Sequence, residues 1–288
     1  MNSLPQEFVR NVVGSALAED IGAGDITTET AIPSDQRAEA CIVAKEPCVV
    51  AGLPLVEEVF IQVERTITVK SLVGEGDVVD EGTRVCVLGG PARGIVTGER
   101  TALNFLQRLS GIATLTRQFV DEIAGTKARI LDTRKTTPTL RILEKYAVAI
   151  GGGTNHRMGL FDAVMIKDNH RAILARLGPK ALGDAVATAR QSHPNAPIII
   201  EADTLEQVEE ALAAGANHIL LDNMTPDELR EAVMLVGGRA KTEASGGVRL
   251  DTVHSISATG VDYISVGALT HSARAVDFSL EVVNDPYA

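Results

Sequence analysis

Acidic side chains follow apolar runs at a regular spacing in the second half of the chain. Glu201, Asp222 and Glu243 are each 21 residues apart, the length of one strand-and-helix repeat. If the apolar runs are strands of an α/β barrel, their ends converge on one mouth, where barrel enzymes place their active sites. Carboxylates there can bond the hydroxyls of a ribose, stabilise an oxocarbenium-like transition state, or hold Mg²⁺ beside a pyrophosphate. Each acid taken singly has a second interpretation, namely that it only caps the helix that follows.

Basic residues are concentrated in one stretch of a chain that is acidic overall, with 27 Lys and Arg against 38 Asp and Glu and a formal net charge of −11. That balance argues against a nucleic acid or an anionic membrane as a partner. Between residues 129 and 171, however, eight Lys and Arg stand against four Asp and Glu, and the cations at predicted strand ends or beside a glycine-rich turn are Arg134, Lys135, Arg157 and Lys167. Such a cluster predicts a pocket for a compact polyanion such as phosphate, pyrophosphate or a dicarboxylate. Arg141 and Lys145 lie four residues apart on a predicted helix, and we expect both to be solvated.

Small residues mark two candidate phosphate loops. Ser245-Gly246-Gly247 and Gly267-Ala268 follow the last two predicted strands and come just before helix starts. Because bulky side chains are missing there, backbone N–H groups can approach an oxyanion, and the loops after the final strands are a common phosphate site of α/β barrels. The sequence therefore predicts an enzyme that binds a phosphorylated sugar together with a second anion.

The elements that must position these residues are alternating strands and helices from residue 128 onward. Apolar runs typical of strands cover residues 129–131, 163–166, 198–200, 218–221, 240–242 and 263–266. Helical patterns lie between most of them, for example over 204–214 and 225–235. Continuous apolar strands that alternate with helices indicate a parallel sheet buried on both faces, and the number of repeats favours a closed barrel over an open doubly wound sheet.

The first hundred residues have a different pattern. Helical spacing covers residues 5–19 and 53–63, and β-rich pieces cover 38–51, 66–72 and 84–88. A long, mostly helical stretch follows over 98–124, and we expect Ser110-Gly111 to interrupt it. These patterns predict a small α/β domain whose last helix leads into the barrel.

The cysteines and the first residues indicate a cytoplasmic protein. Cys41, Cys48 and Cys86 are odd in number and form no C-x-x-C pair, so they fit neither a zinc site nor a disulfide framework and are expected in a reducing compartment. The opening MNSLPQEFVR has no apolar segment typical of a signal peptide, and no apolar run approaches the length that spans a bilayer.

Five motifs make the chain similar to one enzyme family. They are GERTALN at 98–104, DTRKT at 132–136, GGGTNHR at 151–157, IKDNH at 166–170 and VGALT at 266–270. With these motifs in this order, the chain resembles the quinolinate phosphoribosyltransferases. The similarity runs from Glu19-Asp20 to about Phe278, and the second and third motifs are highly specific.

The resemblance implies a reaction and a fold. Quinolinate and phosphoribosyl pyrophosphate would give nicotinate mononucleotide, pyrophosphate and CO₂ in de novo NAD biosynthesis, with Mg²⁺ and without an organic cofactor. The implied fold is an N-terminal α/β sandwich-like domain over residues 1–112, with the C-terminal tail 273–288 packed on it, and an incomplete TIM-like α/β barrel over 113–272 that holds the substrate site. This is the type II phosphoribosyltransferase fold. The family also implies a homodimer, or a hexamer built as a trimer of dimers, in which Arg100 reaches the neighbouring site.

Individual residues match family positions. Those that would hold the pyridine dicarboxylate are Arg134, His156, Arg157 and Lys167. The expected catalytic residues are Lys135 and Lys167, near the reacting centre and the pyrophosphate, and Glu201 and Asp222, around the ribose and Mg²⁺, which they would bind directly or through water. The expected 5′-phosphate loops are Ser245-Gly246-Gly247 and Val266-Gly267-Ala268, and Thr133 completes the expected substrate contacts.

Three other functions are open on the residues alone. The nearest is a phosphoribosyltransferase of similar fold that acts on nicotinate or is encoded with molybdate-transport genes, although a monocarboxylate needs fewer cations than this chain supplies. A barrel aldolase with Lys167 or Lys135 as a Schiff base is the second, but it needs no pyrophosphate site. A non-catalytic metabolite sensor is disfavoured, because no candidate site residue is lost.

Overall fold

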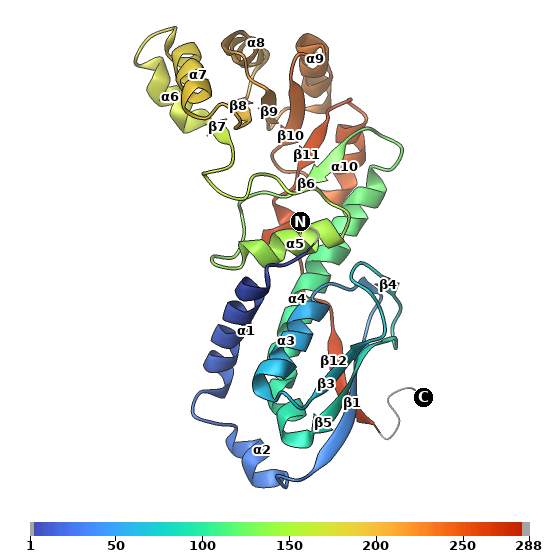
Figure 1. Ribbon diagram of the computed structural model, residues 1–288. Coiled ribbons are helices and arrows are strands. Elements are labelled where there is room, and N and C mark those ends of the chain that lie inside the picture. Colours follow the sequence, from blue (N-terminus) through green and yellow to red (C-terminus); the bar gives the residue numbers. More distant parts are fainter. Residues whose placement is uncertain (1–2, 284–288) are drawn as a thin grey trace. The chain divides into compact units, whose positions relative to one another are not determined.

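The computed structural model describes residues 3–283, which form two compact units (Figure 1). The first unit holds the chain as far as Arg117, the segment Ile142–Gly152 and the part from Ala273 onward, and the second holds Gln118–Arg141 and Gly153–Ser272. The ends of the expected ranges 1–112 and 273–288 include residues 1–2 and 284–288, which lie outside the described part. Among the described helices, none is long and apolar enough to cross a membrane.

An antiparallel sheet forms the centre of the first unit. Its strands lie in the order β12 (Phe278–Val283), β1 (Arg37–Ala44), β5 (Arg84–Pro91) and β3 (Thr68–Ser71), and β2 (Cys48–Val49) pairs separately with β4 (Val78–Val79). The C-terminal strand β12 pairs with β1 from Ala44 opposite Phe278 to Glu39 opposite Val283. The buried side chains include all three cysteines, which are free thiols.

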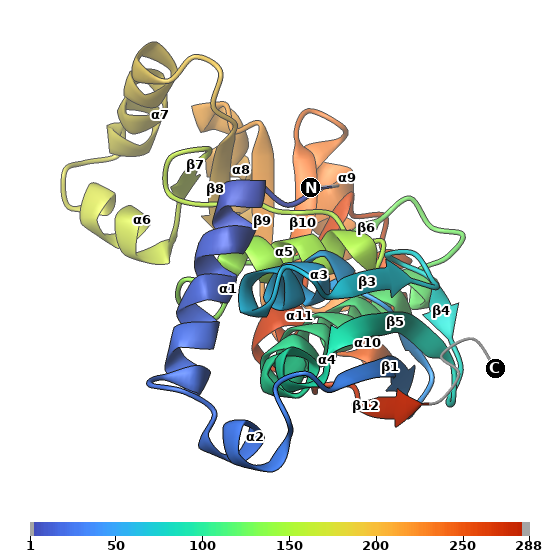
Figure 2. The same cartoon turned by 60° about the horizontal axis from the view of Figure 1, so that its bottom comes forward.

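The helices of the first unit are α1 (Gln6–Ile21), α2 (Ile26–Ala31), α3 (Leu53–Val63), most of α4 (Ala92–Glu122) and α5 (Arg141–Ile150) from its second residue. α1 and α3 lie side by side (Figure 2). The interruption expected at Ser110-Gly111 is wrong, because α4 continues through both residues. The Ser110 hydroxyl accepts from the N–H of Ala51 and donates to its carbonyl, and Gly111 packs against the main chain of Arg274. These two small residues therefore allow close packing against the helix and do not end it.

We expect Gly111→Ala to lower the free energy of unfolding by about 1–3 kcal/mol, because a Cβ at Gly111 would overlap the carbonyl oxygen of Arg274. Gly183→Ala is the matched control. Gly183 lies inside α7 (Ala181–Ser192), where an added Cβ meets nothing within 4 Å, so helix propensity should raise stability by as much as about 1 kcal/mol. Urea unfolding followed by circular dichroism measures both variants. Equal effects of the two substitutions would contradict the packing described for Gly111.

Lys145 is buried, contrary to the expectation that it is solvated. Lys145 and Glu144 are 0% and 1% exposed, while Arg141 is half-buried. Glu144 Oε1 pairs with Arg108 Nη2 at 2.9 Å. A spacing of four residues shows that two side chains share a helix face, but the packing of the helix decides whether that face meets water.

Six parallel strands form the sheet of the second unit, in the order β6 (Arg129–Leu131), β11 (Tyr263–Ser265), β10 (Lys241–Ser245), β9 (His218–Asp222), β8 (Ile198–Ala202) and β7 (Val164–Ile166). From β7 to β11, successive strands are neighbours, and the first strand β6 lies beside the last, as in a barrel and unlike a doubly wound sheet. Within the described residues β6 and β7 share no ladder, so the barrel is incomplete, as the resemblance implies. The closed barrel favoured by strand alternation alone is wrong, because the chain between β6 and β7 forms α5, which belongs almost entirely to the first unit.

The helices of the second unit return the chain to the start of each next strand. They are α6 (Asp168–Ala175), α7, α8 (Leu205–Ala214), α9 (Pro226–Val236), α10 (Leu250–Ser257) and α11 (Ala268–His271). Two of them begin at threonine caps. Thr204 accepts from the N–H of Gln207, and Thr225 forms a reciprocal capping box with Glu228 ahead of Pro226. Because the strands run parallel, their polar ends come to one side of the unit.

Candidate active site

The strand pairing brings the three regularly spaced acids onto one face of the sheet. Paired residues of parallel strands point to the same face, and Leu220 is opposite both Glu201 and Glu243. Asp222 lies two residues after Leu220, opposite Ser245, and shares that face. Glu201 and Asp222 lie near the carboxyl ends of their strands, whereas Glu243 lies in the middle of β10 and is 0% exposed.

A cavity of about 810 Å³ opens in the second unit at these strand ends. The predicted site residues that line it are Thr133, Arg134, Lys135, His156, Arg157, Lys167, Glu201, Asp222, Ser245, Gly246, Gly247, Gly267 and Ala268. Val266 is not among the lining residues, because its side chain is buried in the core. Arg100 belongs to the first unit, where it is an exposed residue of α4. The residues expected to hold the two substrates thus line one cavity, with these two exceptions.

Arg134 and Arg157 form the cationic wall of the cavity. Arg157 Nη1 donates to the carbonyl of Ala163 at 3.2 Å. Burial, and then the positive charge of Arg134, lower the pKa of Arg157. The Nε of Arg134 is buried and has no hydrogen-bond partner within residues 3–283. Two crowded guanidinium groups with a buried donor still unused are suited to a carboxylate- or phosphate-bearing ligand.

Lys167 lies between the cationic and the acidic sides of the cavity. Its Nζ is 3.1 Å from Glu201 Oε2, and the other oxygen of Glu201 accepts from the backbone N–H of Asp168 at 3.2 Å. Lys135 follows β6 in a turn in which its N–H donates to Thr133 Oγ1 at 3.0 Å. Both lysines therefore reach the cavity from loops that directly follow strands.

Three acids lie close enough to hold one metal ion. Oxygens of Glu201, Asp203 and Asp222 all lie within 4.8 Å of one another, and carboxylate oxygens are donors that Mg²⁺ takes in proteins. Burial, and then the charges of Glu201 and Asp203, raise the pKa of Asp222, which is a cost that a bound cation would relieve. Asp203 was not predicted. The sequence did contain a signal for it: residues two apart in an extended chain point to the same side, so Asp203 could be expected beside Glu201.

We expect Asp222→Asn to raise the stability of the metal-free protein at neutral pH. Because the pKa of Asp222 is higher in the folded chain than in the unfolded one, ionisation of this carboxyl opposes folding. The penalty is absent below about pH 4, where the carboxyl is protonated in both states, and it grows as the pH rises through the folded pKa. Thermal unfolding across this pH range, without divalent cations, measures the difference. A variant that is less stable than the parent at neutral pH would contradict the electrostatic argument.

The loop after β10 has a backbone that only glycine suits. Gly246 has a φ of 99°, and a Cβ there would overlap the side-chain oxygen of Asn223. Two hydrogen bonds hold Asn223 in place. Its backbone N–H donates to the carbonyl of Ser245 at 2.8 Å, and its side-chain amide donates to Asp222 Oδ2 at 2.7 Å. The backbone of the loop is therefore open to the cavity and is fixed beside the acids.

Two buried acids support the loop of His156 and Arg157: Asp132, and Glu243, which was expected at the barrel mouth but not among the residues that contact substrate. Asp132 is 0% exposed, and its carboxylate accepts from the N–H of His156 at 2.8 Å and from the amide of Asn155 at 2.7 Å. Glu243 Oε2 lies 3.3 Å from His156 Nε2. Asp132 opens the DTRKT motif and Glu243 continues the 21-residue spacing, but neither pattern tells whether the acid faces a ligand or a loop. Glu243 lines the cavity and Asp132 does not, and the remaining lining residues outside the expected set are Met165, Asp168, Leu220, Asn223, Val248, Arg249, Ser265 and His271.

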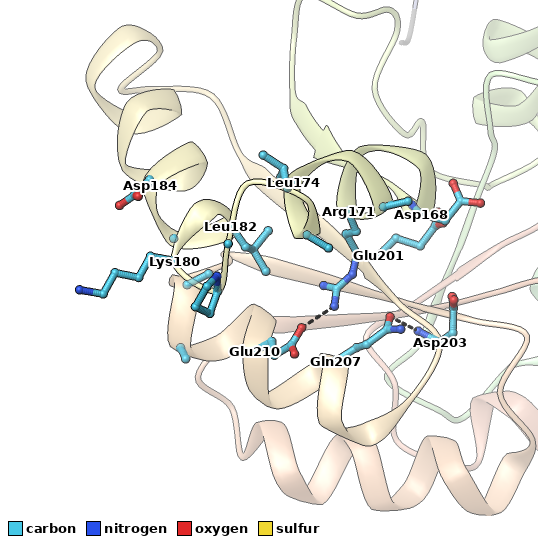
Figure 3. A pocket seen from close by; sticks show the side chains of 17 residues that line it. Asp168, Arg171, Leu174, Lys180, Leu182, Asp184, Glu201, Asp203, Gln207 and Glu210 are labelled. Carbon is cyan, nitrogen blue, oxygen red and sulfur yellow. Dashed lines mark hydrogen bonds and ion pairs between the residues drawn. The ribbon is translucent and has the colours of Figure 1, made fainter.

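A second cavity, of about 990 Å³, lies between α6, α7 and α8 and shares Asp168 and Glu201 with the first. Figure 3 shows its side chains, with Arg171 paired to Glu210 at 2.6 Å and Gln207 bonded to the backbone of Asp203. The charge of Arg171 is thus paired through Nη2, while its Nη1 is buried without a hydrogen-bond partner within residues 3–283. The first cavity, where Arg134 and Arg157 lie together, is better suited to an anionic substrate.

Comparison with known proteins finds the same family over both units. The family described as quinolinate phosphoribosyl transferase, C-terminal domain, matches residues 112–281, and the corresponding N-terminal domain matches residues 25–110. These matches confirm the resemblance that the five motifs indicated.

Three relatives illustrate the similarity. A Nicotiana glauca protein named quinolinate phosphoribosyltransferase (decarboxylating) 2, mitochondrial, is 45% identical over 96% of this chain and 83% of its own. A Bacillus subtilis protein named probable nicotinate-nucleotide pyrophosphorylase (carboxylating) is 43% identical over 95% and 93%. The structure of nicotinate-nucleotide pyrophosphorylase from Francisella tularensis superposes with a TM-score of 0.91, at 38% identity over 98% of each chain. The fold is therefore shared with the Francisella tularensis protein.

Proposed function

The chain belongs to the quinolinate phosphoribosyltransferase family, and we propose that it performs the family's reaction in the cavity at the strand ends of its second unit. The enzyme transfers phosphoribose to quinolinate with decarboxylation, a step of NAD biosynthesis. The aldolase, sensor and nicotinate-specific alternatives are set aside with this assignment. One observation supports the location above all: Arg134 and Arg157 line the same cavity as Glu201 and Asp222.

The cationic wall is the proposed site for quinolinate. Its two carboxylates would bind Arg134, Arg157 and Lys167, with His156 beside them. A charge-assisted hydrogen bond contributes about 1.5–3 kcal/mol, so two anchored carboxylates can hold the ring nitrogen against the anomeric carbon of the ribose. The unused Nε of Arg134 supports this assignment.

The acidic side and the glycine loops are the proposed site for phosphoribosyl pyrophosphate. Glu201 and Asp222, with Asp203 as a third acid, would hold Mg²⁺ directly or through water, and a bound Mg²⁺ would neutralise charge on the pyrophosphate. The 5′-phosphate would bind the backbone of 245–247 and of 266–268, where Gly246 leaves the main chain accessible. Thr133 and Lys135 would contact the pyrophosphate from the loop after β6.

The proposed chemistry needs no covalent enzyme intermediate. The ring nitrogen of quinolinate forms a bond to the anomeric carbon as the bond to pyrophosphate breaks, and the carboxylates of Glu201 and Asp222 stabilise positive charge on the ribose. The ring nitrogen is then cationic, so its positive charge stabilises the electron pair that stays on C2 when the bond to the carboxylate breaks and CO₂ departs. A proton at C2 completes nicotinate mononucleotide. Lys135 and Lys167 stabilise the leaving pyrophosphate in this scheme.

The location in the cell and the assembly are part of the same proposal. All three cysteines are free thiols, which favours a reducing compartment, and we place the enzyme in the cytoplasm. The plant relative cited above is named mitochondrial, so cell fractionation with a compartment marker is the test.

The assembly that we propose is a homodimer, or a hexamer of three dimers, in which Arg100 of one subunit completes the site of another.

Mixing two inactive variants tests the shared site. Arg100→Ala and Glu201→Gln should each be nearly inactive alone. If subunits exchange freely, half of the dimers are mixed and each has one intact site, so activity should return to about a quarter of the parent value. No recovery after verified exchange would show that Arg100 acts within its own subunit or not at all.

The reaction itself is tested by CO₂ release from carboxyl-labelled quinolinate, with nicotinate run in parallel. We expect release that requires both phosphoribosyl pyrophosphate and Mg²⁺. Consumption of nicotinate in place of quinolinate would identify a different pyridine substrate. Trapping of a ribosyl- or pyridyl-enzyme adduct by mass spectrometry would overturn the direct displacement.

A further inference from the structure

Glu243 lies beneath the cavity, and the reaction scheme gives it no part. Its side chain is 0% exposed, and its Oε2 lies 2.8 Å from His218 Nε2 and 3.3 Å from His156 Nε2. The hydroxyl of Ser265 donates to the other oxygen. Burial alone would raise the pKa of Glu243, but the two imidazoles outweigh it and lower this pKa to about 2. The protein therefore keeps a full negative charge in its interior, next to His156, which precedes Arg157 of the cationic wall.

The proton of the His156 ring has a defined position. Its Nδ1 accepts a hydrogen bond from the backbone N–H of Arg157 at 2.6 Å, so the ring proton belongs on Nε2, the nitrogen that faces Glu243. The carboxylate thus favours the tautomer that lets Nδ1 accept. Through this ring, the main chain of Arg157 is tied to the middle of β10.

His218 is held in place as well. Its ring centroid lies 5.4 Å from that of Tyr263 and 6.4 Å from that of His156. His218, Glu243, Tyr263 and Ser265 come from three adjacent strands, so the whole cluster is anchored in one hydrogen-bonded sheet. A rigid support of this kind can fix the orientation of a side chain in the cavity above it.

We propose that Glu243, supported by His218 and Ser265, is a positioning residue that orients the His156–Arg157 segment for quinolinate. The inference rests on the proposed role of Arg157 in holding a carboxylate of that substrate. It predicts a selective effect, because none of the contacts proposed for phosphoribosyl pyrophosphate uses this segment. Those contacts come from the acids Glu201, Asp203 and Asp222, from the glycine loops, and from Thr133, Lys135 and Lys167.

Glu243→Gln tests the inference, because it keeps the shape of the side chain and removes the charge. We expect the Kd of quinolinate to rise about tenfold, while the Kd of phosphoribosyl pyrophosphate with Mg²⁺ stays within about twofold. Nitrogen-15 NMR of histidine-labelled protein should show His156 losing its single tautomer, with the signal assigned by His156→Gln. Glu209→Gln, at an exposed position of α8, is the matched control and should change neither measurement.

Equal weakening of both substrates, or an unchanged His156 tautomer in folded Glu243→Gln protein, would overturn the inference. If that variant does not fold, Ser265→Ala decides, since it removes one hydrogen bond to Glu243 and leaves the charge of the carboxylate in place. It should weaken quinolinate selectively and by less, and unchanged binding would count against the proposal. Arg157→Ala distinguishes a failure of the proposed quinolinate site from a failure of the positioning role alone. If it leaves quinolinate binding intact, the proposed substrate site fails and the positioning role with it. If it weakens binding and Glu243→Gln does not, only the positioning role fails.

Discussion

Arg157→Ala is expected to raise the Kd of quinolinate by about 100-fold and to change the Kd of phosphoribosyl pyrophosphate by less than about threefold. The guanidinium lies partly buried beside Arg134, so a bound carboxylate relieves the repulsion between two cations. A lost charge-assisted hydrogen bond costs about 1.5–3 kcal/mol, equivalent to roughly 10- to 150-fold in affinity. Isothermal titration calorimetry with each substrate measures the two constants separately.

Two further variants sharpen this result. Arg157→Lys keeps the charge but loses the planar fork, and we expect an intermediate loss of quinolinate affinity. Arg176→Ala, at the exposed C-cap of α6 and away from the cavity, should leave both constants unchanged. If Arg157→Ala weakens both substrates equally, Arg157 does not have the role assigned to it.

Glu201→Gln is expected to lower kcat by about 10²–10³-fold, the usual effect of removing one preorganised electrostatic group. The carboxylate of Glu201 accepts a hydrogen bond from the backbone N–H of Asp168 and pairs with Lys167. It is therefore fixed before the substrate arrives. Glutamine has the same shape but provides no negative charge for the ribose or for Mg²⁺. The loss should therefore appear in kcat at saturating concentrations of both substrates, measured by the rate of CO₂ release.

The same experiment includes a test of the acidic side. Asp222→Asn should also lower kcat, and both variants should need more Mg²⁺ for half-maximal rate. Glu209→Gln is again the surface control. A kcat within about threefold of the parent value for Glu201→Gln would show that this carboxylate does not act on the reacting centre.

Much of the local structure could be predicted because it depends on short stretches of sequence. Helix α3 has its predicted limits, and α8 and α9 each begin one residue after the predicted start. Predictions failed where distant packing decides the outcome. Ser110-Gly111 looks like a helix break, yet close contacts with Ala51 and Arg274 keep it inside α4. Lys145 looks like a surface residue, yet it is buried.

The sequence by itself determined the family, the order of strands and helices, and which residue types stand at the strand ends, because motifs and periodicity are properties of neighbouring residues. The resemblance implied an incomplete barrel, but only tertiary structure decided that the described strands leave it open between β6 and β7, and that Asp203 joins Glu201 and Asp222. It also decided that Glu243 faces His156 inside the protein. These features depend on distances between residues far apart in the chain and on the exclusion of water around them, and both arise only when the strands pack together.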